Sequence, residues 1–178
     1  MKNHRLTRFI RRGGIIAYPT ESCFGLGCDP KNKKAINKII KLKKRSRIKN
    51  FILIGSSIKQ FDNFISPLND ATQKKLFSKW PGPHTWLINV NNRCPNWLKS
   101  NSKIALRIPS FSKCHDLVRS IDMAITSSSL NSSGKMPLKN YRDVCRFLPN
   151  QVKLIGGRIG KNKKPSVIIF YTEKGHGV

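Results

Sequence analysis

The sequence predicts a single α/β (α+β) domain over residues 1–178, in which helices pack on a twisted mixed sheet. Two observations lead to this fold class. Short runs of β-branched and aromatic residues alternate along the chain with segments of helical period. A chain of 178 residues with 38% hydrophobic residues is also long enough to bury one core, and it contains no internal repeat or clear linker.

The first strand follows a short basic lead. Leu6, Phe9 and Ile10 have the spacing of an amphipathic turn or helix, which two glycines at 13 and 14 end. The apolar residues 15–18 then predict a buried strand that ends at Pro19. The same composition predicts further strands at residues 51–54, 85–90, 104–108, 123–127, 152–155 and 167–171.

Helices are predicted between these strands. One begins with Asp29 as its N-cap and Pro30 as its first residue, and its isoleucines at 36–40 form an apolar stripe. Lys43 continues that stripe on the buried side, so either its stem lies along the core with the ammonium in water, or it faces a ligand. Three more helices are predicted over residues 70–79, around Cys114, Leu117, Val118 and Ile121, and over residues 141–148.

The chain carries a formal net charge of +27, from 35 Lys and Arg residues against 8 Asp and Glu residues. Such a field attracts polyanions, so nucleotides and nucleic acid are the candidate ligands. The alternative is compositional drift, because the chain is rich in Lys, Asn and Ile together and many of its lysines would then only be solvated surface. Charge alone therefore does not decide the function.

The cysteines predict free thiols in a reducing compartment. Their number is odd, no C-x-x-C pair occurs, and no signal-like apolar segment begins the chain. No stretch reaches the roughly 20 apolar residues that a membrane helix needs. We therefore expect a soluble, cytoplasmic protein with no protein-held metal and no membrane contact, in which the cysteines are mainly buried or incidental, at Cys23, Cys28, Cys94, Cys114 and Cys145.

Polar segments that follow or connect strands are the candidate sites. The segment 19–27 places Thr20 and Glu21 directly after a buried strand. Thr20 can donate to and accept from a small polar substrate, whereas Glu21, one of only two glutamates, either takes part in the chemistry or anchors the loop through backbone N–H groups. The Pro-Gly-Pro turn before Thr85 is predicted to aim that side chain.

Two later segments have the same character. Residues 125–134 leave a strand and are rich in hydroxyls and amides, which suit phosphate or ribose oxygens but are also typical of a flexible loop. Residues 156–158 and 165–166 flank a basic turn. Neither a P-loop nor a G-x-G-x-x-G turn is present, which excludes a standard nucleotide site of those types.

Carboxylates for two-metal catalysis are also scarce, so phosphoryl chemistry would depend on cationic side chains. Three of them lie at a helix-to-strand junction and one lies in a later predicted strand. These cations would neutralise the developing charge, with one Mg²⁺ at most, carried in by the nucleotide. They are Lys43, Arg45, Lys49 and Arg107.

Eight motifs in order resemble the short form of the YrdC-type threonylcarbamoyl-AMP synthase family, also called TsaC. They cover nearly the whole chain, and eight motifs in register are hard to obtain by chance. The motifs are Gly-Gly-Ile-Ile-Ala-Tyr-Pro-Thr-Glu-Ser, Phe-Gly-Leu-Gly-Cys-Asp-Pro, Leu-Lys-Lys-Arg, Trp-Pro-Gly-Pro-His-Thr, Ala-Leu-Arg-Ile-Pro, Ser-Leu-Asn-Ser-Ser-Gly, Gly-Gly-Arg and Pro-Ser-Val-Ile.

The resemblance implies a mostly open sheet around a basic concave surface, and a nucleotidyltransferase that makes threonylcarbamoyl-AMP and pyrophosphate from L-threonine, bicarbonate and ATP. This adenylate feeds the threonylcarbamoyl modification of adenosine 37 in tRNA (t6A), so tRNA and downstream t6A transferase proteins are implied partners. The alternative is a non-catalytic module that binds double-stranded RNA or tRNA on the same surface. That alternative lacks an RNP-like stacking motif.

The resemblance also implies roles for individual residues, and Thr20 would contact the substrate threonine. The implied catalytic residues are Lys43, Arg45, Ser129 and Asn131. The implied substrate-binding residues are Thr20, Lys49, Thr85, Arg107, Arg158 and Ser166. Ser46 and Leu130 depart from the family pattern. The bulkier Leu130 beside Ser129 could crowd the pocket, which leaves the packing of this loop open, but the polar residues are kept and we still expect activity.

Overall fold

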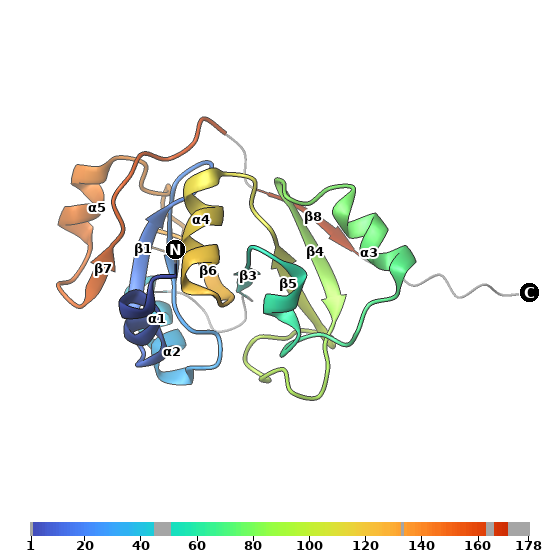
Figure 1. The fold of residues 1–178 in the computed structure, drawn as a ribbon. Helices are drawn as coiled ribbons and strands as arrows, with labels where there is room; N and C mark the ends of the chain where they lie inside the picture. The colour runs from blue at the N-terminus through green and yellow to red at the C-terminus, as the bar shows by residue number, and fades with distance from the viewer. Residues whose placement is uncertain (1, 45–50, 133, 163–165, 171–178) are drawn as a thin grey trace, which may run out of the picture.

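The structure, a computed structural model, describes residues 2–44, 51–132, 134–162 and 166–170. In these ranges, helices pack on one eight-stranded sheet (Figure 1). The helices are α1 (His4–Arg11), α2 (Lys33–Leu42), the 3-10 helix η1 (Ile58–Phe61), α3 (Asp70–Phe77), α4 (Ser112–Ile121) and α5 (Tyr141–Phe147). The strands are β1 (Ile15–Pro19), β2 (Phe24–Gly27), β3 (Ile52–Ile54), β4 (His84–Asn89), β5 (Lys103–Arg107), β6 (Ile125–Ser129), β7 (Val152–Leu154) and β8 (Val167–Phe170).

The sheet is mixed and open, as predicted. Its strand order is β7-β1-β2-β6-β3-β5-β4-β8, so β7 and β8 are the two edges. The pairs β1–β7, β3–β5 and β4–β8 are parallel, and the remaining neighbours are antiparallel. Both edge strands come from the last part of the chain.

Strand β6 joins the two halves of the sheet. Its first part pairs with β3, where Ile125 lies opposite Ile54 and Ser127 lies opposite Ile52. Its second part pairs with β2, where Ser129 lies opposite Gly25. β6 therefore lies between β2 and β3 in the sheet, with β3 paired along one of its edges and β2 along the other.

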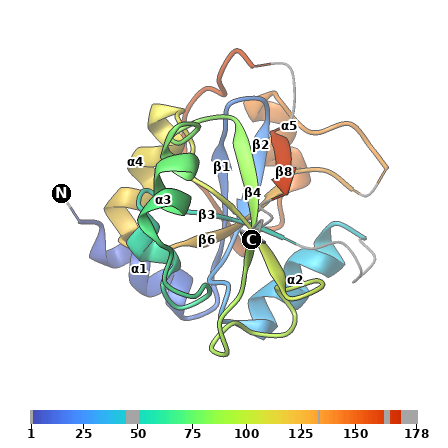
Figure 2. The ribbon, with the colours of Figure 1, turned by 90° about the vertical axis from the view of Figure 1, so that its right-hand side faces the viewer.

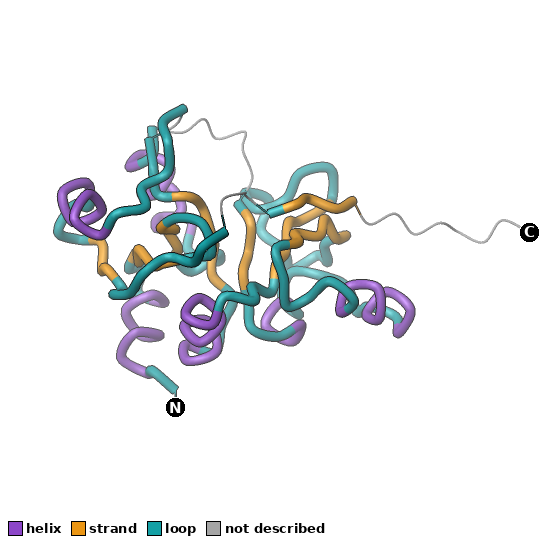
Figure 3. Tube along the Cα trace, turned by 90° about the horizontal axis from the view of Figure 1, so that it is seen from above, coloured by secondary structure: helices purple, strands orange, loops and turns teal. Residues whose placement is uncertain are grey.

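Helices cover both faces of the sheet. Figure 2 shows α1 and α4 on one side of β1 and β2, and α2 and α5 on the other. The residues of β1 alternate accordingly: Ala17 belongs to the same core cluster as Ile36 of α2, whereas Ile16 clusters with Val118 of α4. Seen from above, the helices lie around the periphery and the strands run through the middle (Figure 3).

The structure confirms most of the predicted elements and corrects two of them. Helix α2 begins at Lys33 and not at Pro30, because the side chain of Asn32 accepts a hydrogen bond from the Ala35 N–H at 3.0 Å and forms the N-cap. Asp29 instead accepts from the Lys31 N–H at 2.8 Å in a turn before the helix.

The second correction is β2, which was expected to be part of a loop. Its four residues are buried and pair antiparallel with β1, and Pro19 pairs with Phe24. The glycine at 27 is needed for this packing, because a Cβ there would lie 2.7 Å from the backbone oxygen of Thr126. The strand is thus a place where two backbones approach closely.

Candidate functional site

A cavity of about 380 Å³ is lined by residues of the three neighbouring strands β2, β6 and β3. Seven segments of the described chain supply its walls: the β1–β2 turn with the start of β2, the end of α2, β3, the end of β5, α4, β6 with the residues after it, and the residue before β8. Its predicted polar residues are Thr20, Glu21, Lys43, Arg107, Ser129, Asn131 and Ser166. The structure therefore brings together most of the described residues that the sequence singled out.

Lys43 is the C-cap of α2 and only 4% exposed. Its ammonium donates to the backbone oxygens of Ser129 and Asn131 and, at 2.9 Å, to the side-chain oxygen of Asn131. The Ser129 hydroxyl donates to that same Asn131 oxygen at 2.7 Å. The lysine thus holds the segment after β6 in place while its charge faces the cavity.

Arg107 and Glu21 form a largely buried ion pair in the lining of the cavity. The Nη2 of Arg107 donates to Oε1 of Glu21 at 2.6 Å, and the two side chains are 14% and 13% exposed. The Nε of Arg107 donates to the backbone oxygen of Gly82 at 3.0 Å. Glu21 therefore anchors a side chain, whereas the sequence suggested an anchor to backbone N–H groups.

The turn that carries Thr20 is closed by its own hydrogen bonds. The backbone N–H of Thr20 donates to the oxygen of Cys23 at 2.9 Å, and its hydroxyl donates to the same oxygen at 2.7 Å. The hydroxyl oxygen keeps its capacity to accept from a ligand. Thr20 is therefore a lining residue whose hydroxyl can still accept a hydrogen bond.

Several lining residues were not predicted. Ile52 and Ile54 of β3 line one wall together with Cys114 of α4. Burial raises the pKa of the Cys114 thiol, and the carboxylate of Glu21 raises it further. Helical period placed Cys114 on a buried face, but no local signal indicates that this face borders a cavity.

Ser127 also lines the cavity, and the buried Tyr18 donates to its hydroxyl at 2.8 Å. Burial raises the pKa of Tyr18, which therefore remains a hydrogen-bond donor. This contact joins β1 to β6 and orients a hydroxyl that the sequence identified only as part of a polar run.

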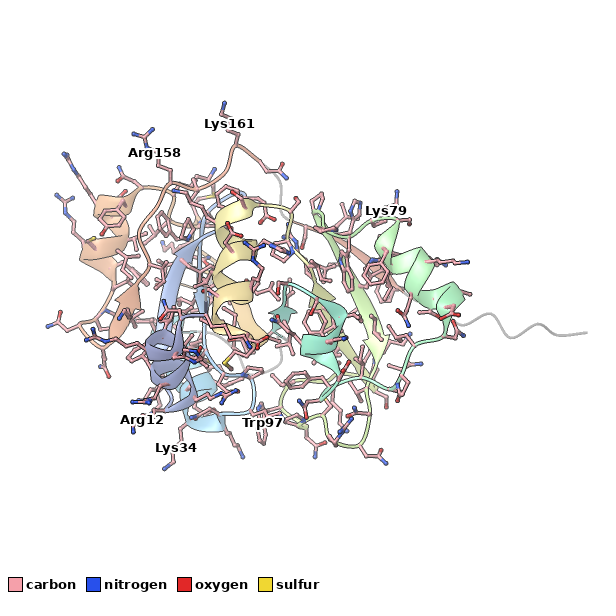
Figure 4. All side chains as sticks on the ribbon, viewed as in Figure 1. Arg12, Lys34, Lys79, Trp97, Arg158 and Lys161 are labelled. Atoms are coloured by element: carbon pink, nitrogen blue, oxygen red, sulfur yellow. The ribbon has the colours of Figure 1, made fainter. Side chains whose placement is uncertain are left out.

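Two of the described residues that the sequence predicted, Thr85 and Arg158, lie outside this lining. Thr85 is fully buried, and its hydroxyl donates to that of Ser166 at 2.8 Å, so it supports a lining residue. Arg158 is exposed and points away from the molecule (Figure 4). Arg45 and Lys49 lie outside the described residues.

The structure answers the question that Leu130 left open: this residue does not crowd the pocket. Its side chain is fully buried in the core cluster that includes Phe24 and Val144, and it does not line the cavity. The backbone N–H of Leu130 donates to the oxygen of Phe24 at 2.7 Å, which continues the β2–β6 pairing. The larger side chain thus fills the core while Ser129 and Asn131 face the cavity.

The described residues contain no group of three or more His, Cys, Asp and Glu side chains placed to hold a metal ion. Among the same residues, no helix is long and apolar enough to cross a membrane. All five cysteines are free thiols, and Cys145 is the exposed one.

Comparison with known proteins decides the family. The family model Sua5_yciO_yrdC, with the description "Telomere recombination", matches residues 8–177. The chain belongs to the Sua5/YciO/YrdC family. Within this family, the protein of Methylobacillus flagellatus named threonylcarbamoyl-AMP synthase is 40% identical over 169 residues, which are 94% of each chain. The protein of the same name from Thiobacillus denitrificans is 38% identical over 165 residues, which are 92% of this chain and 88% of that one.

Solved structures of the Sua5/YciO/YrdC family have the same fold. YciO of E. coli aligns with a TM-score of 0.79 and 25% identity over 96% of this chain and 84% of its own. The Sua5 protein of P. abyssi complexed with L-threonine aligns with a TM-score of 0.81 and 24% identity over 96% of this chain. This chain spans about half of that Sua5 chain, 51% of its length.

Proposed function

We propose that this chain is a threonylcarbamoyl-AMP synthase, which forms threonylcarbamoyl-adenylate and pyrophosphate from L-threonine, bicarbonate and ATP. The observation that carries the proposal is the convergence of Thr20, Lys43, Arg107, Ser129 and Asn131 on one cavity. Relatives that match almost the whole chain and have this name support it. In such a cavity an amino acid and a triphosphate can meet beside two cations.

The proposed reaction has two steps. The threonine amine, held near Thr20, attacks bicarbonate or CO₂ to give a carbamate, with water released when bicarbonate reacts. A carbamate oxygen then attacks the α-phosphorus of ATP in line, and pyrophosphate leaves with the bonding electrons of the broken P–O bond. The reaction is a nucleotidyl transfer that needs no protein nucleophile, so the protein acts by aligning two anions and offsetting their charge.

Lys43 and Arg107 are the described cations of this cavity. Arg107 offers forked donors for phosphate or carboxylate oxygens, and Lys43 offers a positive charge fixed by the Ser129–Asn131 segment. Ser129 and Asn131 gain a fixed position from the same contacts. A preorganised charge of this kind stabilises developing negative charge without moving during the reaction.

The residues fit a nucleotide that brings its own Mg²⁺ better than a protein-held metal. Glu21 is the carboxylate among the described lining residues, and Arg107 already occupies it. Magnesium in nucleotide sites is commonly held by phosphates and few protein carboxylates. The metal would supply further neutralisation of the phosphates.

We also propose that the product is consumed by t6A transferase proteins that act on tRNA in the cytoplasm. An acyl adenylate hydrolyses readily, so its use requires a nearby acceptor. The net charge of +27 favours an encounter with tRNA.

The test is to incubate the purified chain with labelled threonine, bicarbonate and ATP. We expect an adenylate that contains the label, and pyrophosphate in equal amount, only when all three substrates are present. A chain that binds RNA but releases no threonine-dependent pyrophosphate would support the non-catalytic alternative.

A further inference from the structure

Glu21 is the acidic residue among the described side chains that line the cavity, and its role is not explained by the proposed chemistry. A carboxylate is an unfavourable neighbour for a triphosphate and for a carbamate. The chain has only 8 Asp and Glu residues in total, which makes an acid at this position more informative. The contacts of Glu21 indicate what it does there.

Hydrogen bonds hold the Arg107 guanidinium at two of its nitrogen atoms. Nε–H donates to the Gly82 oxygen at 3.0 Å and an Nη2–H donates to Glu21 at 2.6 Å. A guanidinium has five N–H donors in one plane, so three remain, one on Nη2 and two on Nη1. Two contacts at different corners fix that plane, and the remaining donors then point in defined directions.

A later segment of the chain holds the backbone at Glu21. Its backbone oxygen accepts from the Asn162 N–H at 3.0 Å, and the oxygen of Thr20 accepts from the Gly160 N–H at 2.9 Å. A Cβ at position 160 would lie 2.7 Å from the Glu21 oxygen, so the segment around Gly160 packs directly on this turn. The backbone from which the Glu21 side chain extends is therefore fixed, and the carboxylate itself is held by its contact with Arg107.

We propose that Glu21 is a positioning residue that acts through Arg107: it fixes the guanidinium so that its remaining donors face the anionic substrates. This inference rests on the proposed function for the identity of those substrates. Substrate-facing groups must be held by their neighbours to within a fraction of an ångström, and a long arginine side chain loses that precision without a second support.

The rival role for Glu21 is a general base that takes a proton from the threonine ammonium. The two roles predict different behaviour of the glutamine variant. Glu21→Gln keeps an oxygen that can accept from Arg107 but cannot take up a proton. A positioning role therefore survives in part in this variant, whereas a base is lost completely.

The experiment is a double-mutant cycle with wild type, Glu21→Ala, Arg107→Ala and the double variant, read as kcat/KM for threonine-dependent pyrophosphate release. We expect each single variant to lose about 100-fold, as for loss of one preorganised donor. The double variant should lose no more than Arg107→Ala alone, because Glu21 has no target without the guanidinium. Multiplied losses in the double variant would overturn the proposal.

Glu21→Gln adds a second readout. We expect a loss of about 10-fold, since a charge-assisted hydrogen bond becomes a neutral one, and an unchanged acidic limb in the dependence of kcat/KM on pH. Disappearance of that limb would identify Glu21 as the base and contradict a positioning role. If Glu21→Ala does not fold, the cycle is built with Glu21→Gln.

The matched control is the exposed ion pair of Asp116 and Arg119 on α4, whose atoms are 2.7 Å apart and whose side chains are 55% and 69% exposed. Alanine variants of this pair should leave kcat/KM unchanged. A wild-type chain without threonine-dependent turnover would contradict the proposed function only. In that case the dissociation constant for ATP is measured for the same four variants. Independent effects of Glu21 and Arg107 on this constant would overturn the positioning role.

Discussion

At the residue scale, Lys43 shows how one side chain can be both an anchor and a charge. Helical period correctly placed it on the buried side of α2, but the period does not say what the ammonium meets. In the structure it meets three oxygens of Ser129 and Asn131, which are 86 and 88 residues away in sequence. Such partners depend on the sheet bringing α2 and β6 together, so local pattern could not predict them.

Replacing Lys43 with Ala should lower turnover by on the order of 10² to 10³, because it removes a preorganised charge and releases the segment that contains Asn131. The measurement is the rate of pyrophosphate release with all three substrates saturating, alongside circular dichroism to confirm the fold. Wild-type turnover in this variant would remove Lys43 from the mechanism.

Leu130 shows a second limit of local pattern at the same scale. It lies between Ser129 and Asn131, and the sequence alone left open how its bulk packs beside them. Successive side chains of an extended segment alternate between two faces, and Leu130 takes the core face. Its size is therefore a matter of core packing, and the two polar residues keep the cavity face.

At the element scale, β2 was the strand that sequence reasoning missed. Its four residues, Phe24–Gly27, contain two glycines, which are typical of turns and weaken a strand signal. What makes the segment a strand is tertiary: β1 on one side and β6 on the other supply its hydrogen bonds. The amphipathic α4, by contrast, was predictable because its own period identifies its buried face.

Gly27→Ala should destabilise the fold by about 2 kcal/mol or more, since the new methyl would lie 2.7 Å from the Thr126 backbone oxygen and strands must move apart. Urea unfolding measures the change in the free energy of unfolding. The matched control is Gly156→Ala, where a Cβ meets nothing within 4 Å and the change should be near zero. Equal stability of the two variants would contradict the close approach of β2 and β6.

The end of β2 also carries a pH effect. Burial raises the pKa of Cys28 from 9.0 to about 12, while Thr126 contributes an opposing hydrogen bond. In the unfolded chain the thiol loses its proton near its ordinary pKa, but in the folded chain it keeps it. The free energy of unfolding therefore falls as the pH rises from about 9 toward 12, and this thiol contributes about 1.4 kcal/mol per pH unit to the fall.

We expect Cys28→Ser to remove this part of the alkaline loss of stability. The measurement is urea unfolding of both chains at several pH values above 8. Cys145→Ser is the control, because Cys145 is exposed and its replacement should leave the pH dependence as it is. Parallel curves for wild type and Cys28→Ser would contradict the burial of a protonated thiol.

At the scale of the whole molecule, RNA binding through the net charge of +27 and the reaction in the cavity should depend differently on the salt concentration. RNA held by phosphate contacts alone should be released steeply, by about 10³ to 10⁵ in affinity between roughly 50 and 200 mM salt for some 6–10 contacts. The reaction in the cavity depends on a few partly buried groups, which salt screens less. Threonine-dependent pyrophosphate release should therefore persist at moderate salt.

The check is to titrate salt against both activities on one preparation, with filter binding of tRNA beside the pyrophosphate assay. A parallel loss of the two signals would indicate that adenylate formation depends on the same diffuse charge as RNA binding.

The strand order has a consequence for how the chain matures on the ribosome. β7 and β8 complete opposite margins of the sheet, β7 beside β1 and β8 beside β4, although both follow the other six described strands in the sequence. A nascent chain that has reached only residue 150 exposes two open margins and lacks Ser166 at the cavity. Catalytic competence should therefore arrive only when β7 and β8 have emerged, and chaperones that shield strand margins should matter most just before that moment.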